Sequence, residues 1–305
     1  MRVLLTQART GHAGLFWLAV LMAGLAVVAA AGVVVDERVL LGAPIWLKPF
    51  KFAVSFGLYA FVLAWMLSLG SRGRRTGAVL GWVIVVASVI EIGVIVGQVV
   101  RGRASHFNDS TPLDEALFSL MGATILVLWL ATAALAVVVL LRQPGLEPAT
   151  AWAIRLGLVV GLVGMALGML MIMQPGGGAH AVGVPDGGPG LPLTGWSTTG
   201  GDLRIGHAVG LHALQVLPLL AAALTQVPRR LLDETARVRL VWIAAAGYAG
   251  VMTLTTWQAL RAQPLLSPDA ATLSAATVLL VATGAAAVLT VVRHRGITEV
   301  AAASP

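Results

Sequence analysis

The sequence is dominated by apolar segments long enough to cross a lipid bilayer, and this feature limits its fold more than any other. A spanning helix needs about 20 mostly apolar residues. Eight segments meet this requirement: 13–35, 47–69, 77–100, 115–141, 151–173, 205–226, 238–261 and 268–292. Only 11% of the residues are charged, whereas a soluble domain carries about 25%. The sequence therefore predicts an all-α integral membrane helical bundle of about eight transmembrane helices, forming one polytopic domain over residues 1–305.

Arginine-rich loops predict how the chain is oriented in the membrane. The basic residues on one side of the predicted topology include Arg72, Arg74, Arg75, Arg142, Arg229, Arg230, Arg293 and Arg295. Cytoplasmic loops carry an excess of Lys and Arg, so both termini are predicted to be cytoplasmic. Arg also greatly outnumbers Lys, and Ala, Gly and Val are abundant. This bias suggests a GC-rich bacterial genome, and hence a location in the bacterial plasma membrane.

Charge and cysteine content exclude several classes of function. The net charge of +7 comes from short basic clusters between apolar segments, without the aromatic-interleaved basic stripe of nucleic-acid-binding proteins. No nucleic-acid partner is expected, and the expected partners are the lipid bilayer and a small-molecule ligand. The chain has no cysteine, which excludes disulfides, thiolate zinc sites, iron–sulfur clusters and thiol catalysis.

The longest connection, residues 174–204, lies between the fifth and sixth segments on the predicted extracytoplasmic side. It is glycine-rich and almost free of charge. A connection of this length without helical or strand periodicity is usually a functional lid or disordered. Trp196 and the apolar run 191–193 indicate that it folds onto the outer surface. We therefore expect residues 174–204 to form an extracytoplasmic lid loop.

Glycines recur every three or four residues in the fifth segment, at Gly157, Gly161, Gly164 and Gly168. Small residues at this spacing allow two helix backbones to approach closely. Packing within the chain is favoured over a dimer interface.

Polar residues in the second and third segments form stripes toward the predicted outer half. At 100° per residue, Lys51 and Tyr59 share a face with Lys48. The alternative for the lysines is that their ammonium groups extend to the lipid headgroups. In the third segment, Glu91 and Gln98 share a face. An intramembrane carboxylate costs about 2.5–3.5 kcal/mol, so Glu91 is expected to be protonated, paired or bound. The alternative to a functional role is a helix–helix hydrogen bond or ion pair.

The sixth segment carries Arg204, His207, His212 and Gln215 within one arc, and Gln258 lies on a polar face of the seventh. Such arcs are typical of helices that line a polar cavity. The residues expected to line one outward-facing cavity, or to bind its ligand, are Lys51, Tyr59, Glu91, Gln98, Trp196, Arg204, His207, His212, Gln215 and Gln258.

Three kinds of chemistry fit these residues. His106, His207 and His212 would ligate haem or a metal ion, although the five-residue spacing of the last two is not the i, i+4 spacing of paired ligands. A proton-coupled or anion transporter would use the buried acid with its basic neighbours. A membrane-embedded enzyme would use Glu91 as general base, with His207 or His212 as its acid–base partner. No serine-nucleophile or nucleotide-binding motif is present, and the sequence leaves open whether the chain is an enzyme.

The sequence thus predicts an integral membrane protein whose outward-facing polar cavity binds a small ligand, haem or a metal ion, with redox or enzyme chemistry included. The alternative is a transporter that uses the same cavity. The segments 46–53, 101–108, 178–204 and 210–220 resemble a group of uncharacterised multi-pass membrane proteins of GC-rich bacteria, actinobacteria in particular. The resemblance covers most of the chain. It implies a multi-pass architecture and no activity, cofactor or substrate.

Overall fold

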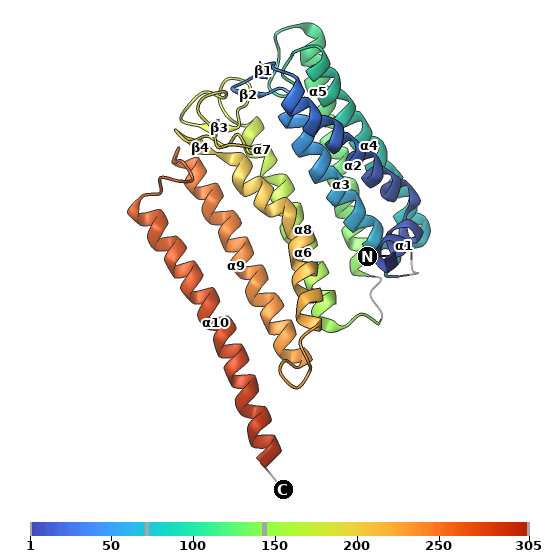
Figure 1. The fold of residues 1–305 in the computed structure, drawn as a ribbon, viewed down its shortest axis with the longest axis vertical. Helices are drawn as coiled ribbons and strands as arrows, with labels where there is room; N and C mark the ends of the chain where they lie inside the picture. Colours follow the sequence, from blue (N-terminus) through green and yellow to red (C-terminus); the bar gives the residue numbers. More distant parts are fainter. Residues whose placement is uncertain (1, 71–72, 142–144, 304–305) are drawn as a thin grey trace. The chain divides into compact units, whose positions relative to one another are not determined.

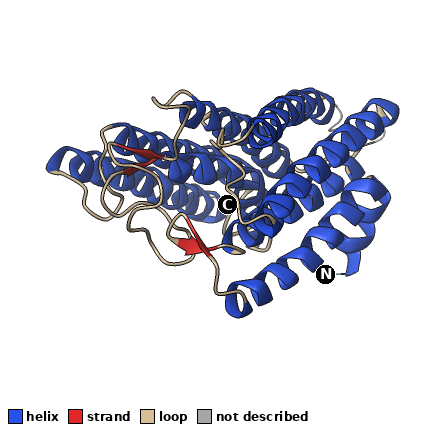
Figure 2. Cartoon of the chain, turned by 90° about the horizontal axis from the view of Figure 1, so that it is seen from above, coloured by secondary structure: helices blue, strands red, loops and turns tan. Residues whose placement is uncertain are grey.

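The computed structural model describes residues 2–70, 73–141 and 145–303, with side chains described as far as His294. Its regular structure is almost entirely helical, and its short strands lie in connections between helices (Figure 2). Within the described residues, eight helical segments are long and apolar enough to cross a membrane. The predicted all-α membrane bundle is therefore confirmed. Arg72 and Arg142, which helped to predict the orientation, lie outside the described residues.

Except at the C-terminal ends of α6 and α10, the long helices begin and end within a few residues of the predicted segments. They are α2 (Ala13–Val35), α3 (Leu47–Ser68), α4 (Arg74–Val100), α5 (Pro112–Leu140), α6 (Pro148–Ala166), α8 (Leu203–Thr225), α9 (Glu234–Leu260) and α10 (Ala270–Ala303). The strands are β1 (Val39–Leu40), β2 (Ala43–Pro44), β3 (Ala181–Val182) and β4 (Gly201–Asp202), and β1 pairs with β2 in an antiparallel arrangement.

Two features differ from the predicted segments. A short helix, α1 (Arg2–Gly11), precedes the first span. It is amphipathic and has only 10 residues, so a search for long apolar runs does not detect it. The fifth predicted segment is divided at Leu167 into α6 and the short helix α7 (Gly168–Ile172).

The contacts divide the chain into two compact units. Unit 1 contains Met1–Pro144 and Met169–Thr199, and unit 2 contains Gly145–Gly168 and Gly200–Pro305. The sequence indicated no boundary of this kind. Most of the lid loop therefore belongs to unit 1. Each unit is described by itself.

In unit 1, α2 packs along α3 and α4 packs along α5, while α3 also contacts α4 (Figure 1). Leu15 and Leu63 are among the fully buried aliphatic side chains. Helix α1 lies against the end of α3, where Gly11 approaches the backbone of Ala64 so closely that no Cβ would fit. The end of the unit at which α2 and α4 finish and α3 and α5 begin is called the lid end below, because the lid loop contacts it.

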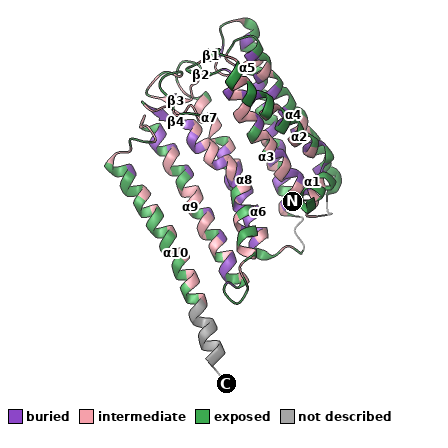
Figure 3. Ribbon diagram, viewed as in Figure 1, coloured by how far each residue is buried: buried purple, intermediate pink, exposed green. Residues whose placement is uncertain are grey.

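In unit 2, α6 packs against α8, and α9 packs against both. A Cβ on Gly164 would lie 2.4 Å from the backbone of Gly210, so these two helices are in close contact through glycine. The prediction that the glycines of the fifth segment pack within the chain is thereby confirmed. Helix α10 packs on α9, and none of its most apolar stretch is buried (Figure 3).

Candidate functional site

Glu91 lies in α4 and is completely buried within unit 1, with an exposed fraction of 0%. Neither of its carboxylate oxygens has a hydrogen-bond partner among the described residues. Ser88, one turn earlier, is equally buried, and its Oγ also has no such partner. Buried polar groups are nearly always hydrogen-bonded, and the exceptions often mark functional positions. The helix–helix hydrogen bond considered as the alternative for Glu91 is not present in the described structure.

His106, in the connection between α4 and α5, is an ionisable group beside Glu91. Its Nε2 lies 3.9 Å from Oε1 of Glu91, and its Nδ1 lies 3.2 Å from Oγ of Ser105. The charge of Lys48 on α3 also acts on Glu91. His106, which the sequence suggested as a haem or metal ligand, thus lies beside Glu91.

The connection between α4 and α5 is held at both ends, and this fixes the position of His106. Asp114 in the first turn of α5 is fully buried. It accepts hydrogen bonds from Nε2 of Gln98 at 2.8 Å and from Nη1 of Arg101 at 2.7 Å. Oγ1 of Thr111 donates to the same carboxylate at 2.7 Å. Gln98, predicted to bind a ligand, thus contributes to the anchor of this connection.

A second imidazole–carboxylate pair comes from the lid loop. Nδ1 of His180 lies 2.5 Å from Oδ2 of Asp186. Asp186 also accepts from the backbone amides of His180 and Ala181. Burial is the largest influence on the pKa of Asp186 and raises it. The hydrogen bonds from the ring and the amides, with the charge of His180, nevertheless hold this pKa below its usual range.

The two imidazoles lie next to each other. The rings of His106 and His180 are nearly parallel, with an interplanar angle of 28° and centroids 6.3 Å apart. Phe52, Phe107 and Phe118 have ring centroids 5.8 to 6.2 Å from that of His106, and Phe107 also contacts His180 edge-on. The arrangement is therefore a continuous series, Glu91–His106–His180–Asp186, whose middle members lie among aromatic rings.

The lid loop is attached to the lid end of unit 1 at several points. Nζ of Lys51 donates to the carbonyl of Thr194 at 2.6 Å. Gly178 has φ +104°, and a Cβ at this position would lie 2.5 Å from the Phe107 ring. The expectation that the loop folds onto the surface is met in unit 1. Lys51 is thus bonded to the lid loop.

The other predicted residues of unit 1 have structural partners. The hydroxyl of Tyr59 is bonded to that of Thr132 on α5. The carbonyl of Trp196 accepts from the backbone N–H of Leu191 and closes a turn of the lid. Their assignment to ligand binding stays a prediction.

The remaining predicted residues belong to unit 2. Arg204 forms an ion pair with Asp202 at 2.5 Å, and Nδ1 of His207 is 2.8 Å from the carbonyl of Gly164. Nε2 of Gln258 donates to the carbonyl of Pro264 at 2.7 Å. His212 and Gln215 are half-buried on α8, and the buried Oε1 of Gln215 has no hydrogen-bond partner among the described residues. Because Glu91 belongs to unit 1, a cavity that these residues share with it stays a prediction.

The metal interpretation gains no ligand set. Among the described side chains, no group of three or more His, Asp or Glu residues is placed to hold a metal ion. His106 belongs to unit 1, whereas His207 and His212 belong to unit 2. Within unit 2, the bond from His207 to α6 stabilises helix packing.

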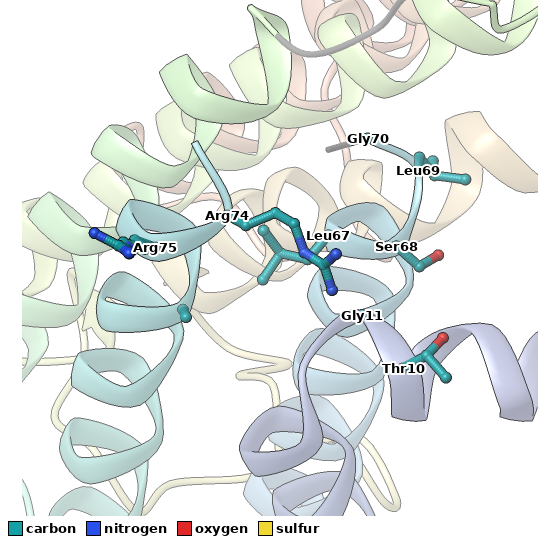
Figure 4. A pocket seen from close by; sticks show the side chains of 9 residues that line it. Thr10, Gly11, Leu67, Ser68, Leu69, Gly70, Arg74 and Arg75 are labelled. Atoms are coloured by element: carbon teal, nitrogen blue, oxygen red, sulfur yellow. The ribbon is translucent and has the colours of Figure 1, made fainter. Parts of the chain in front are cut away.

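A pocket of about 640 Å³ lies at the other end of unit 1, away from the lid end (Figure 4). Its lining includes Thr10 of α1, Ser68 at the end of α3, and Arg74 and Arg75 at the start of α4. None of the residues predicted to line a cavity contributes to it. The pocket also lies at the predicted cytoplasmic side, whereas the sequence predicted a cavity that opens outward.

No protein-family model matches the chain, and no match to a curated protein or a solved structure is found either. The class of the protein follows from its fold: it is a multi-pass helical membrane protein. The resemblance to membrane proteins of actinobacteria stays a prediction.

Two of the four members of the series, His180 and Asp186, were not predicted as site residues, and neither were the aromatic rings beside His106. Asp186, Phe52 and Phe118 become apparent only when the lid and the helices are brought together. The sequence P-D-G-G around Asp186 predicts a turn, which is an ordinary role for aspartate. Its contact with His180, six residues earlier, has no periodic signal.

Proposed function

We propose that the protein is a proton-coupled membrane carrier of the bacterial plasma membrane in which Glu91 is the proton-exchanging group. In one state Glu91 holds a proton, and in another it binds a small ligand that donates hydrogen bonds. The observation that carries this proposal is a completely buried carboxylate with neither oxygen hydrogen-bonded in the described structure.

The energetics favour exchange at Glu91 over a purely structural role. An intramembrane carboxylate is unfavourable by about 2.5–3.5 kcal/mol even on insertion scales, and structural carboxylates recover this through hydrogen bonds. Asp114 has such bonds, and Glu91 has none within the part of the chain that the structure describes. A proton would neutralise Glu91, and a ligand with donor groups would satisfy both oxygens and Ser88 Oγ together.

The position of His106 supports proton exchange in particular. Histidine changes charge near neutral pH and commonly passes protons in membrane proteins. Its Nε2 is 3.9 Å from the carboxylate, so a small side-chain movement or one bridging water would complete a hydrogen bond. The same pair suits an acid–base enzyme, but no nucleophile or cleavable substrate is indicated. Transport is therefore the function that we put forward.

Chemical labelling tests the proposal without knowledge of the ligand. Dicyclohexylcarbodiimide is apolar and adds to protonated carboxyl groups in membranes, giving a stable N-acylurea that mass spectrometry detects. We expect labelling of Glu91 at neutral pH that declines as pH rises, and no label at Asp114. The E91Q variant should lose the label, whereas E115Q, which alters an exposed carboxylate on α5, should keep it. Absence of label at Glu91 in folded wild-type protein at any pH would contradict the proposal.

A further inference from the structure

The site contains two imidazole–carboxylate pairs that face each other. In one pair, Nε2 of His106 in the α4–α5 connection lies 3.9 Å from Oε1 of Glu91 on α4. The other, His180 with Asp186, lies entirely in the lid loop at 2.5 Å. The imidazoles are nearly parallel, with centroids 6.3 Å apart, and the side chains are only 21% and 16% exposed. Both pairs consist of an imidazole and a carboxylate. One is formed by α4 and the α4–α5 connection, and the other by the lid loop alone.

Two imidazolium ions in this position would repel each other. Their separation is short, and Phe107 and Phe118 replace much of the water that would screen them. Groups that interact this strongly do not titrate independently but take up protons in coupled steps. Each carboxylate, in turn, stabilises a proton on its own imidazole. The two pairs therefore compete for the first proton.

We infer that the lid loop carries a second proton-binding site, the His180–Asp186 pair, and that His106 and His180 hold one proton between them at neutral pH. The identification of Glu91 as the final acceptor rests on the proposed function. The sharing of a proton by the two imidazoles does not.

The proton path follows from the atoms in the series. In the proposed path, a proton on His180 passes to His106, which leaves His180 neutral beside Asp186. His106 then donates from Nε2 to Oε1 of Glu91, so that an ion pair becomes a neutral imidazole and a protonated carboxyl. The net charge of the His106–Glu91 pair is unchanged by this last step.

Other charged groups lie on the elements next to the imidazoles and contribute to the local field. On the neighbouring elements these are Lys48, Lys51, Arg101, Arg103, Asp114 and Glu115. Lys51 is bonded to the lid, and Arg101 is paired with Asp114 at 2.7 Å. Lys48 acts on Glu91 and lies 5.9 Å from the centroid of the Phe52 ring. Fixed charges of this kind shift the midpoints of both imidazoles and do not themselves produce coupling between them.

Nitrogen NMR of ¹⁵N-histidine-labelled protein in lipid nanodiscs tests the inference. The chain has six histidines, and single replacements assign His106 and His180. D186N removes the charge that stabilises a proton on His180 while keeping the side-chain shape. We expect it to raise the midpoint of His106 by about one pH unit. H180F, which keeps an aromatic ring in the lid, should raise it as well. His12, bonded to the carbonyl of Ala78 in unit 1, serves as the unaffected control.

The outcomes separate the two proposals. An unchanged His106 midpoint in both D186N and H180F, with the lid still protected from protease, would overturn the shared proton. It would leave the labelling of Glu91 unaffected. Conversely, coupled histidines with no protonation of Glu91 would support the lid site and contradict the proposed function.

Discussion

Glu91 and Asp114 are two buried carboxylates of the same unit with opposite surroundings. Asp114 accepts four hydrogen bonds from side chains, including those of Gln98 and Arg101. Glu91 has none among the described residues. A buried polar group without partners lowers stability, so Glu91 is better explained by function than by folding.

The first prediction compares these two residues. Replacing Glu91 by Leu removes an unsatisfied polar group and should stabilise the protein by about 1–3 kcal/mol. Replacing Asp114 by Leu removes the acceptor that Gln98 and Arg101 share and should destabilise it by about 1–3 kcal/mol. Thermal unfolding in detergent, followed by circular dichroism, measures both. A loss of stability in E91L comparable to that in D114L would show that Glu91 has a structural role.

Asp186 leads to a pH prediction. Its folded pKa lies below its usual range, so its contribution to lid docking is fully present above the unfolded value of about 3.9. That contribution is lost as pH falls through the lower folded pKa. We expect the amides of His180 and Ala181, which donate to Asp186, to lose hydrogen-exchange protection below about pH 4, after correction for intrinsic rates. In D186N the protection should be weak at every pH, and strong protection in that variant would contradict the assignment.

At the level of single residues, the sequence indicated Glu91 and Lys51 because each is a charged residue within an apolar segment. A carboxylate inside an apolar run is unfavourable, and this is visible without coordinates. The contact between His180 and Asp186 was not predictable, since both lie in a loop without periodicity. Likewise, Gln98 shares a helical face with Glu91, but its partner Asp114 comes from the next helix. Helical projection shows the face of a residue and not what covers it.

Among the elements, α6 and α8 show the closest packing. Gly164 contacts the Gly210 backbone. A Cβ added to Gly161 would instead meet its nearest atom, Cβ of Leu214, at 3.7 Å, which is an ordinary contact. The two glycines are three residues apart on the same helix. They therefore form a matched pair for testing which helix face needs a small residue.

The two substitutions are predicted to change the stability of the protein in opposite directions. G164A places a Cβ against backbone that cannot move away easily and should destabilise the protein by about 1–3 kcal/mol. G161A meets only ordinary contacts and should be neutral or stabilise it by about 0.5–1 kcal/mol, because Ala favours the helix. Melting temperatures of the two variants in one detergent decide this. Equal effects would mean that α6 and α8 are not in contact at Gly164.

The lid loop provides the second prediction for an element. Gly178 combines a positive φ of +104° with contact to Phe107, so G178A should detach this part of the lid. Gly188 has no positive φ and only an ordinary contact at 3.8 Å, so G188A should leave the lid in place. Limited proteolysis of the lid should be markedly faster in G178A alone. Equal cleavage of the two variants would show that the lid does not dock through Gly178.

Hydropathy alone was sufficient to predict the eight spans, because about 20 apolar residues have few alternatives to a membrane helix. The same criterion overlooked α1, which is short and amphipathic, and the break at Leu167 within the fifth span. The two-unit division was also not apparent, since it depends on contacts between distant segments. Local composition thus predicts which helices form and says little about how they group.

For the whole molecule, orientation in the membrane can be tested because the chain has no cysteine. A single introduced cysteine is then the only thiol. In intact cells, a membrane-impermeant maleimide should label T199C in the lid and should not label Q226C between α8 and α9. Both positions are exposed in the structure. The reverse pattern would mean that the lid faces the cytoplasm.

The central claim is that Glu91 exchanges a proton within the membrane, and infrared difference spectroscopy measures this most directly. Wild type, E91Q and E115Q in lipid nanodiscs would be titrated from acid to alkaline pH while the carbonyl band of protonated carboxyl groups is followed. The account predicts a titrating band in wild type and E115Q that is missing in E91Q. Identical titrating bands in wild type and E91Q would contradict it.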